Sequence, residues 1–354
     1  MGLTLDECRE ILDNSHTDGA LIVTEPNRIY LSGYASTQAA IAITKEGVFY
    51  FTDKRYLHEA REKIPAYMRI GEGSIAQAAE LLRPCRRIGI EFELSHSLFN
   101  FAAAKTGKRG IFSRALHDIS PVLKDMRAVK SQSELCHIRK AQSITDDAFA
   151  KLKPFIKEGV SEIELAARLE YIMQSQGAAL AFDTIMAFGE NSAVPHAHRS
   201  ERKLKDGDMI VMDFGAKWQG YCSDMTRTLA FGSISGRRAQ IYDLVLQANV
   251  KAISRLKAGV VGANVQDETR KLFADAGVSE HFTHSLGHGV GIDIHESPNY
   301  NARLLRENSV ITVEPGLYFD GDFGVRIEDM VKIEQDGAEN LTKSDKSLII
   351  IGKN

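Results

Sequence analysis

The sequence MIVMDFGAKWQGYCSDMTRTLAF, residues 209–231, decides the fold. Two apolar stretches, at 210–214 and 226–231, have the composition of buried strands and flank a turn-like segment at 217–220. If the middle of that segment is the tip of a hairpin, Asp213 lies directly opposite Asp224. Opposed Cβ atoms lie about 4.5–5.5 Å apart, and like charges there are destabilising unless a cation lies between them. The stretch therefore predicts a hairpin that holds a cation between two aspartates.

A second acidic pair repeats this arrangement towards the C-terminus. Glu314 follows one apolar strand, Glu328 lies in another at 325–333, and the turn Asp320-Gly321-Asp322 is midway between them. We expect Pro315-Gly316 to disturb the pairing, because proline donates no hydrogen bond to a sheet. The second pair is thus predicted to face one another with a less regular register.

Helix signals before each pair indicate an internal duplication. Ser131-x-x-Glu134 and Ser161-x-x-Glu164 are capping boxes for two helices that precede the aspartates. Two further helices, at 237–258 and 265–276, precede the glutamates, and each is followed by glycine. A helix–helix–strand–strand unit therefore occurs twice, and each copy donates one carboxylate pair.

Each copy also places a histidine before its first carboxylate. His196 precedes Asp213, and His295 precedes Glu314. Two such half-sites that face each other across a pseudo-twofold axis would build one dinuclear centre.

The pattern of the remaining N-terminal part predicts a smaller α/β domain. A helix that begins at Thr4-x-x-Glu7 is followed by strands at 20–23, 39–44 and 48–51, which alternate with helical stretches. Ser120-Pro121 and the polar residues 124–127 predict a connection. The predicted domains are residues 1–124 and 125–354.

Composition narrows the class of protein. The chain has 354 residues, of which 44% are hydrophobic and 26% charged. Its net charge of −3 gives no indication of the positive charge that nucleic-acid binding requires. No apolar run reaches the roughly 18 residues of a membrane span, and no signal peptide opens the chain, so a cytoplasmic location is expected. The four cysteines are scattered and form no CxxC, which predicts reduced thiols.

The five candidate ligands favour a particular group of metals. His288 lies in Gly287-His288-Gly289-Val290-Gly291, where glycines would let the backbone approach a ligand, and it joins the four carboxylates. Four carboxylates and one imidazole suit Mn²⁺, with Co²⁺ or Zn²⁺ as alternatives. Two such ions about 3.5–4 Å apart activate water at neutral pH.

Simpler interpretations were weighed for these residues. Each acid taken alone could be a solvated strand end, but Asp213 lies inside an apolar run, where an unpartnered carboxylate is costly. The glycine-rich segment could be taken for a nucleotide loop, but no Lys-Ser/Thr follows it.

Several strings together resemble the proline-specific metallopeptidases of the pita-bread fold, that is, Xaa-Pro aminopeptidase (aminopeptidase P) and prolidase. They are Asp213-Phe-Gly-Ala, Tyr221-x-Ser-Asp-x-Thr-Arg-Thr228, His284-Ser-Leu-Gly-His-Gly-Val-Gly291, Glu314-Pro-Gly-Leu-Tyr318 and Arg326-Ile-Glu328. The resemblance covers about residues 125–354 closely. It implies an α+β catalytic domain with duplicated ααββ halves, preceded by a creatinase-like N-terminal domain.

The resemblance also implies roles for individual residues. Asp213 would chelate one metal ion, His288 and Glu314 the other, and Asp224 and Glu328 would bridge both. Glu314 would also carry a proton to the leaving proline nitrogen.

Further residues match positions of the family that contact substrate. His196 and His295 match its substrate-binding histidines, and Arg326 matches an arginine near the proline end. Tyr318 matches a tyrosine near the metal centre, and His284 would pack beside the substrate. Cys222, which shares a strand face with Asp224, is interpreted as packing.

Several functional alternatives stay open at this point. An Xaa-Pro aminopeptidase is slightly favoured over an Xaa-Pro dipeptidase, and methionine aminopeptidase ranks third because it usually lacks the N-terminal domain. The remaining readings are a peptide-binding module without activity and a hydrolase for small non-peptide amides. Creatinase is disfavoured because all five ligand positions are present. Relatives are commonly dimers, so the expected partners are a proline-containing peptide and a second copy of the chain.

Overall fold

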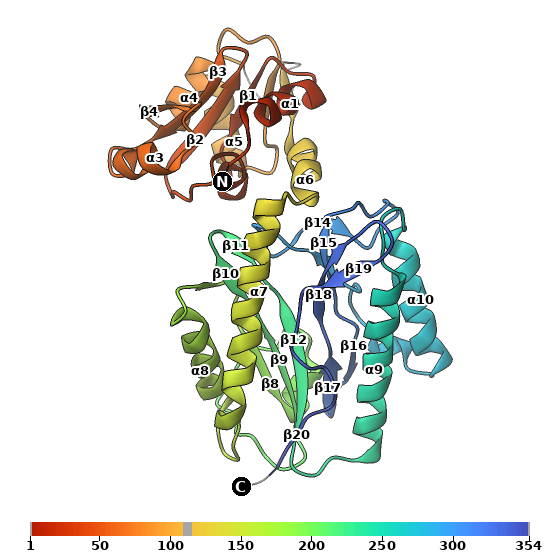
Figure 1. Cartoon of the computed structure of the whole chain (residues 1–354). Helices are drawn as coiled ribbons and strands as arrows, with labels where there is room; N and C mark the ends of the chain where they lie inside the picture. Colours follow the sequence, from red (N-terminus) through yellow and green to blue (C-terminus); the bar gives the residue numbers. More distant parts are fainter. Residues whose placement is uncertain (1, 109–114, 353–354) are drawn as a thin grey trace. The chain divides into compact units, whose positions relative to one another are not determined.

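The computed structural model describes residues 2–108 and 115–352, and the chain forms two compact units (Figure 1). The units comprise residues 1–127 and 128–354. Within the described residues, no helix is long and apolar enough to span a membrane.

The N-terminal unit is the predicted α/β domain. Its elements are α1 (Leu5–Ser15), β1 (Gly19–Ile22), α2 (Glu25–Ser32), β2 (Ala39–Thr44), β3 (Gly47–Thr52), α3 (Leu57–Lys63), β4 (Arg69–Glu72), α4 (Ile75–Leu81), β5 (Ile88–Ile90), α5 (His96–Lys105), β6 (Leu116–Asp118) and α6 (Ser120–Ala128). They build a mixed sheet of order β4-β3-β2-β1-β5-β6. Its apolar side chains pack against the small residues of α4 and α5.

The predicted connection at the end of this unit is wrong. Residues 120–128 form α6, because Pro121 lies in the first turn of the helix, where its missing N–H breaks no hydrogen bond. Leu123 and Ala128 of this helix are buried. A proline after serine therefore marked the start of a helix here.

The C-terminal unit contains the predicted duplication. Its first half consists of α7 (Gln132–Leu152), α8 (Glu162–Gln174), β7 (Ala179–Leu180), β8 (Ile185–Phe188), β9 (Met209–Phe214), β10 (Ala216–Trp218), β11 (Tyr221–Cys222) and β12 (Met225–Phe231). Its second half consists of α9 (Gly236–Arg255), α10 (Gly262–Asp275), β13 (His288–Gly289), β14 (Glu296–Asn299), β15 (Val310–Val313), β16 (Gly316–Phe319), β17 (Phe323–Arg326), β18 (Asp329–Ile333), β19 (Ala338–Asn340) and β20 (Ile350–Ile351).

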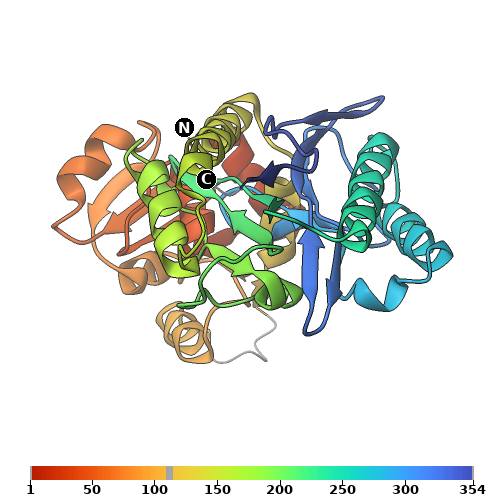
Figure 2. The same ribbon diagram turned by 90° about the horizontal axis from the view of Figure 1, so that it is seen from below.

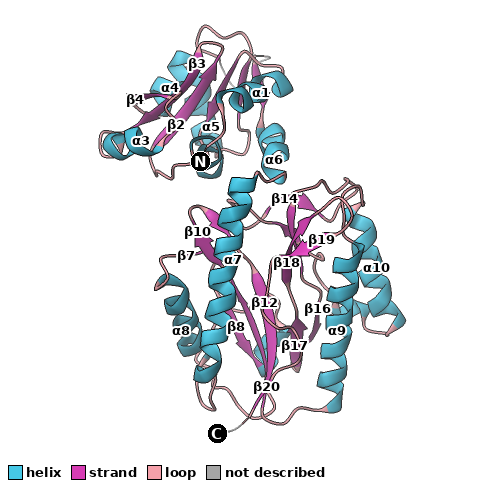
Figure 3. Ribbon diagram, viewed as in Figure 1, coloured by secondary structure: helices cyan, strands magenta, loops and turns pink. Residues whose placement is uncertain are grey.

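Each half packs its helices on its own strands. In Figure 2, α7 and α8 lie on one side of the strands, and α9 and α10 lie on the other side. Ile144 and Leu169 of the first helix pair pack with Ile210, whereas Tyr242 and Phe273 of the second belong to a separate core. Figure 3 shows α7 and α9 as the two long helices that flank the strands.

Most strands of the C-terminal unit belong to two main sheets. One has the order β20-β12-β9-β8 and the other the order β14-β13-β15-β18-β19. The tips of the two hairpins separate into smaller sheets, β11-β10-β7 and β16-β17. The strand β20 pairs with β12 of the first half, so the end of the chain joins the two halves.

The register of the first hairpin corrects the predicted opposition of the two aspartates. Asp213 pairs with Thr226, because the turn residues are Gln219 and Gly220 and both have positive φ. The tip therefore lies one residue later than predicted, which shifts the register by two residues. A shift of two residues keeps side chains on the same face, so Asp224 lies diagonally from Asp213 on the predicted face.

The second hairpin keeps the register that places Glu314 opposite Glu328. On one side of the pair Val313 faces Asp329, and on the other side Gly316 faces Arg326. Both pairings belong to one register. Pro315 lies between β15 and β16, where the regular pairing with β18 and β17 is interrupted, and it does not shift the alignment.

Candidate metal and substrate site

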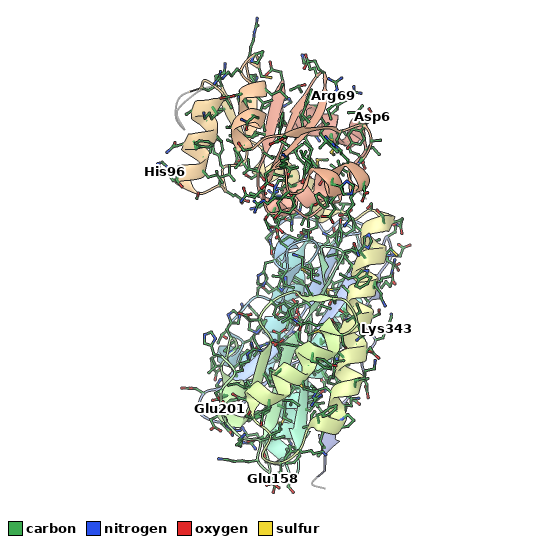
Figure 4. The ribbon with its side chains drawn as sticks, turned by 90° about the vertical axis from the view of Figure 1, so that its left-hand side faces the viewer. Asp6, Arg69, His96, Glu158, Glu201 and Lys343 are labelled. Carbon is green, nitrogen blue, oxygen red and sulfur yellow. The ribbon has the colours of Figure 1, made fainter. Side chains whose placement is uncertain are left out.

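The candidate site is a cavity of about 390 Å³ that is lined by residues of both halves. All five predicted ligands line it, together with His196, His295 and Arg326. The complete lining is Phe182, Ile185, Pro195, His196, Asp213, Asp224, His284, Ser285, Gly287, His288, Ile294, His295, Asn299, Glu314, Arg326 and Glu328. The cavity contrasts with the outer surface of the same unit, where Glu158, Glu201 and Lys343 are exposed (Figure 4).

Three of the predicted ligands already have the geometry of a cation site. One ligand atom each from Asp224, His288 and Glu328 lies within 4.8 Å of the others. His288 Nε2 is 3.4 Å from a carboxylate oxygen of Asp224 and 3.4 Å from one of Glu314. Nδ1 of the same ring lies 3.1 Å from the carbonyl of Gly289, which directs Nε2 towards the carboxylates.

Three buried carboxylate oxygens that belong to the cavity have no hydrogen-bond partner among the described residues. They are Asp213 Oδ1, Asp224 Oδ1 and Glu328 Oε1. A buried carboxylate oxygen without a partner is costly, and carboxylate and imidazole donors suit first-row divalent ions. The donor set therefore fits one or more such ions.

The electrostatics of the carboxylates lead to the same conclusion. Burial, together with the charges of Asp213 and Glu314, raises the pKa of Asp224 well above its usual value. Burial and the neighbouring Asp224 likewise raise the pKa of Glu328. Burial also raises the pKa of Glu314, although His288 opposes this shift. Without a cation, the cluster would hold protons that an ion displaces.

Hydroxyl groups orient the two glutamates. Thr226 Oγ1 donates to Glu328 Oε2 over 2.8 Å, and Thr312 Oγ1 donates to Glu314 Oε1 over 3.1 Å. Each threonine binds one carboxylate oxygen of its glutamate, so the other oxygen is left for the cavity.

Asp213 has an internal cationic partner. Arg326 Nη2 donates to Asp213 Oδ2 over 2.6 Å, and this arginine is 3% exposed. The same guanidinium donates to Tyr318 Oη and to Thr226 Oγ1. Burial raises the pKa of Tyr318 to about 12, so its hydroxyl stays protonated. The sequence predicted the arginine at the site but not this ion pair.

The histidines occupy different places on the cavity wall. His295 packs edge-on against the predicted ligand His288, with ring centroids 4.2 Å apart, and burial lowers the pKa of His295. His284 lies 2.9 Å from the hydroxyl of Tyr318, and burial lowers its pKa to about 4, which keeps this ring neutral. His196 lines the cavity and is exposed. Neutral rings are suited to hydrogen bonding with a substrate carbonyl.

The glycines around His288 allow neighbouring chain segments to approach closely. A Cβ on Gly287 would lie 2.3 Å from the carbonyl oxygen of Thr312, and one on Gly289 would lie 2.5 Å from the backbone of Ser297. These two positions therefore need glycine for packing, and the approach of their backbone to a ligand stays a prediction.

Sequence reasoning missed the apolar wall of the cavity. Phe182, Ile185 and Ile294 line it, and Ile185 pairs with Asp213 across β8 and β9. These residues belong to no motif, and only Ile185 lies on a strand, so no local pattern marked them. Cys222 is buried with its thiol 3.5 Å from the carbonyl of Ile292, in agreement with a packing role.

Two family models match the chain. Residues 136–335 match metallopeptidase family M24, and residues 5–129 match the creatinase/prolidase N-terminal domain.

Individual relatives match over nearly their whole length. An Xaa-Pro dipeptidase of Pyrococcus horikoshii is 36% identical over 349 residues, which cover 96% of this chain and 97% of the relative. The structure of an Xaa-Pro dipeptidase from Bacillus anthracis has a TM-score of 0.90 at 35% identity and covers 98% of both chains. An X-Pro aminopeptidase from Thermotoga maritima has a TM-score of 0.88 at 34% identity, which covers 97% of this chain and 100% of that one.

Proposed function

Because the chain belongs to metallopeptidase family M24 and is thus a metal-dependent hydrolase of peptides, we propose that it is an Xaa-Pro dipeptidase. The sequence alone slightly favoured an Xaa-Pro aminopeptidase. The names of the relatives favour the dipeptidase, since both the Pyrococcus and the Bacillus proteins carry it. A homodimer, a cytoplasmic location and Mn²⁺ as the metal stay predictions.

The observation that carries the proposal is the composition of the cavity. Five candidate metal-ligand side chains, three of them with unpartnered buried oxygens, share one cavity with three further histidines and an apolar wall. We assign the metal site to Asp213, Asp224, His288, Glu314 and Glu328. When bound, divalent ions supply Lewis acidity and activate water for attack on a peptide carbonyl.

The protein's own groups would perform the remaining steps. His196 and His295 would donate hydrogen bonds to the carbonyl oxygen as it gains negative charge. An Xaa-Pro bond is a tertiary amide, so its nitrogen leaves as an amine only if it receives a proton. Glu314 would carry that proton. The apolar residues Phe182 and Ile185 would contact the nonpolar part of the substrate.

One structural observation favours the aminopeptidase as a second candidate. A dipeptidase has to bind the free carboxylate of proline, and a cation is the usual partner of a carboxylate. Among the described residues that line the cavity, Arg326 is the only lysine or arginine, and its guanidinium is bound to Asp213. Tyr318 and Thr226 take further donors of the same guanidinium.

Substrate length decides between the two candidates. We would compare hydrolysis of Xaa-Pro, Xaa-Pro-Yaa and Xaa-Ala at equal concentrations, with Mn²⁺ and with Co²⁺. The proposal predicts cleavage confined to Xaa-Pro dipeptides. Cleavage of Xaa-Pro-Yaa with equal or higher kcat/KM would establish the aminopeptidase, and preference for Xaa-Ala would refute the proline assignment.

A further inference from the structure

The strands that carry the two ligand glutamates are interrupted where the glutamates occur. Regular pairing of β15 with β18 ends at Val313 and Asp329, and pairing of β16 with β17 begins at Gly316 and Arg326. Glu314 and Glu328 lie in the gap. Their positions therefore depend on whatever fixes the backbone there.

A buried asparagine of α9 binds the backbone on both sides of this gap. Asn249 Nδ2 donates to the carbonyl of Val313 over 2.9 Å and to that of Ile327 over 3.3 Å. These two residues directly precede Glu314 and Glu328 in the sequence. One amide group thus ties together the two peptide units that lead into the two ligands.

The orientation of this amide is determined by a lysine. Asn249 Oδ1 accepts from Lys346 Nζ over 2.7 Å, and the asparagine is fully buried. A lysine ammonium only donates, so the atom that faces it must be the amide oxygen. The NH₂ group is therefore left to serve the two carbonyls.

The lysine belongs to a wider buried network that also binds the second glutamate. Asp329 accepts from Lys346 and from Arg227. Arg227 is 1% exposed and donates to the carbonyl of Glu328 over 2.6 Å and to that of Thr226 over 2.9 Å. The backbone on both sides of Glu328 is consequently held by side chains from a helix and a strand, and Lys346 of the C-terminal segment binds Asn249 and Asp329 behind it.

We propose that Asn249 is a positioning residue that sets the relative placement of Glu314 and Glu328, and thereby the affinity of the site for divalent ions. The proposal rests on the assignment of these glutamates as ligands. Asn249 itself does not line the cavity, so its effect has to pass through the backbone. Groups that orient metal ligands from behind typically change metal affinity or activity about 10- to 100-fold when they are removed.

The test measures Co²⁺ binding to the metal-free full chain, followed by the visible absorption of the bound ion. Asn249→Leu keeps the approximate volume and removes both donors, whereas Asn249→Asp places an acceptor against two carbonyls. Both variants are expected to bind Co²⁺ about 10- to 100-fold more weakly and with an altered absorption spectrum. Unchanged affinity and spectrum would overturn the proposal.

A matched control separates positioning from a general loss of stability. Asn27, in the N-terminal unit, is also a buried asparagine whose amide donates to Glu91 and accepts from Arg127. Asn27→Leu is expected to lower the unfolding temperature and to leave Co²⁺ affinity unchanged. An equal loss of affinity in Asn27→Leu and Asn249→Leu would refute the positioning role.

Two further outcomes are distinguishable. If the wild-type chain binds no Co²⁺, the proposed metal site itself is wrong. If Asn249→Leu does not fold, Lys346→Met provides the test. Lys346 is itself partly exposed, and its removal frees the buried amide of Asn249 to rotate. Weaker Co²⁺ binding by Lys346→Met would support the proposal, and wild-type affinity would contradict it.

Discussion

The two halves of the C-terminal unit bring a pair of carboxylates into one cavity in different ways. In the first half, Asp213 lies inside the regular strand β9 and Asp224 lies just before β12. In the second half, Glu314 and Glu328 both lie where the strands are interrupted. The aspartates are therefore diagonal neighbours, whereas the glutamates face each other.

The long helices support these two arrangements with different side chains. Thr145 of α7 and Asn249 of α9 precede the second carboxylate of their halves, Asp224 and Glu328, by the same number of residues. Thr145 Oγ1 accepts from the amide of Ala216, whereas Asn249 donates to carbonyls. The difference reflects the backbone group that needs a partner, which is an N–H group at Ala216 and a carbonyl group at Val313. The two halves thus have a supporting residue at the same offset, which accepts a backbone hydrogen bond in one half and donates in the other.

The halves also differ in how their charges are balanced. Asp213 is paired with Arg326, which the second half supplies. Among the described residues, no Lys or Arg forms a salt bridge with Asp224, Glu314 or Glu328. Bound divalent ions would balance the charge of these three carboxylates.

Removing one carboxylate charge from either half should have the largest effect. Asp224→Asn and Glu328→Gln keep the shape of the side chain and remove the charge that binds a metal ion. We expect kcat to fall about 10³-fold or more, since several kcal/mol of transition-state stabilisation by metal are lost. Steady-state kinetics and elemental analysis would measure this loss. Full activity in either variant would show that its half is not needed.

Removing the internal cation should act mainly on the first half. Arg326→Met leaves Asp213 buried without its partner, so we expect the metal-free protein to lose about 3 kcal/mol of unfolding free energy. Bound Mn²⁺ should restore part of this loss. Urea unfolding with chelator and with Mn²⁺ measures both values. An equal loss in the two conditions would show that the metal does not compensate for the guanidinium.

The histidine of each half should matter for substrate and not for metal. His196→Ala and His295→Ala are each expected to reduce kcat/KM about 10²-fold, because a hydrogen bond to the developing oxyanion is lost. Metal content should stay near that of the wild type. Elemental analysis that shows a missing ion in either variant would reassign that histidine as a ligand.

The pH dependence of metal binding should show the smallest effect. The raised pKa values of Asp224 and Glu328 mean that the metal-free native state holds protons that the unfolded chain releases above its ordinary carboxyl pKa. The stability of the metal-free protein should therefore fall as the pH rises from the ordinary carboxyl pKa to the raised pKa values of the native state. Metal affinity should rise over the same window, by about tenfold per pH unit for each proton displaced.

Calorimetric titration of Co²⁺ at several pH values would measure this dependence. Variants that lack Asp224 or Glu328 should show a shallower slope. An affinity that does not change with pH would contradict the raised pKa values.

The amino-acid sequence predicted the duplicated halves and the carboxylates and histidines of the cavity because both leave local signals. Capping boxes such as Ser131-x-x-Glu134 mark helix starts, and their hydrogen bonds are present in the structure. An acid inside an apolar run, such as Asp213, is costly without a partner, which made it stand out.

Other features left no such signal. The tip of the first hairpin was misplaced by one residue because Gln219, at φ 50°, adopts a conformation in which a side-chain-bearing residue is uncommon. The partners of Arg326 and Asn249 lie far away in the sequence, so no local pattern could identify them. Helix α6 was missed because Ser-Pro occurs both at turns and at helix starts.

The number of divalent ions bound by one chain tests the central claim most directly. Metal-free protein would be loaded with Mn²⁺, freed of excess metal and analysed for its elemental composition. Two ions per chain are predicted, because the carboxylates of both halves meet in one cavity. The same protein with Glu328→Gln should hold fewer than two. A wild-type chain that retains no ion, or a variant that still holds two, would contradict the account.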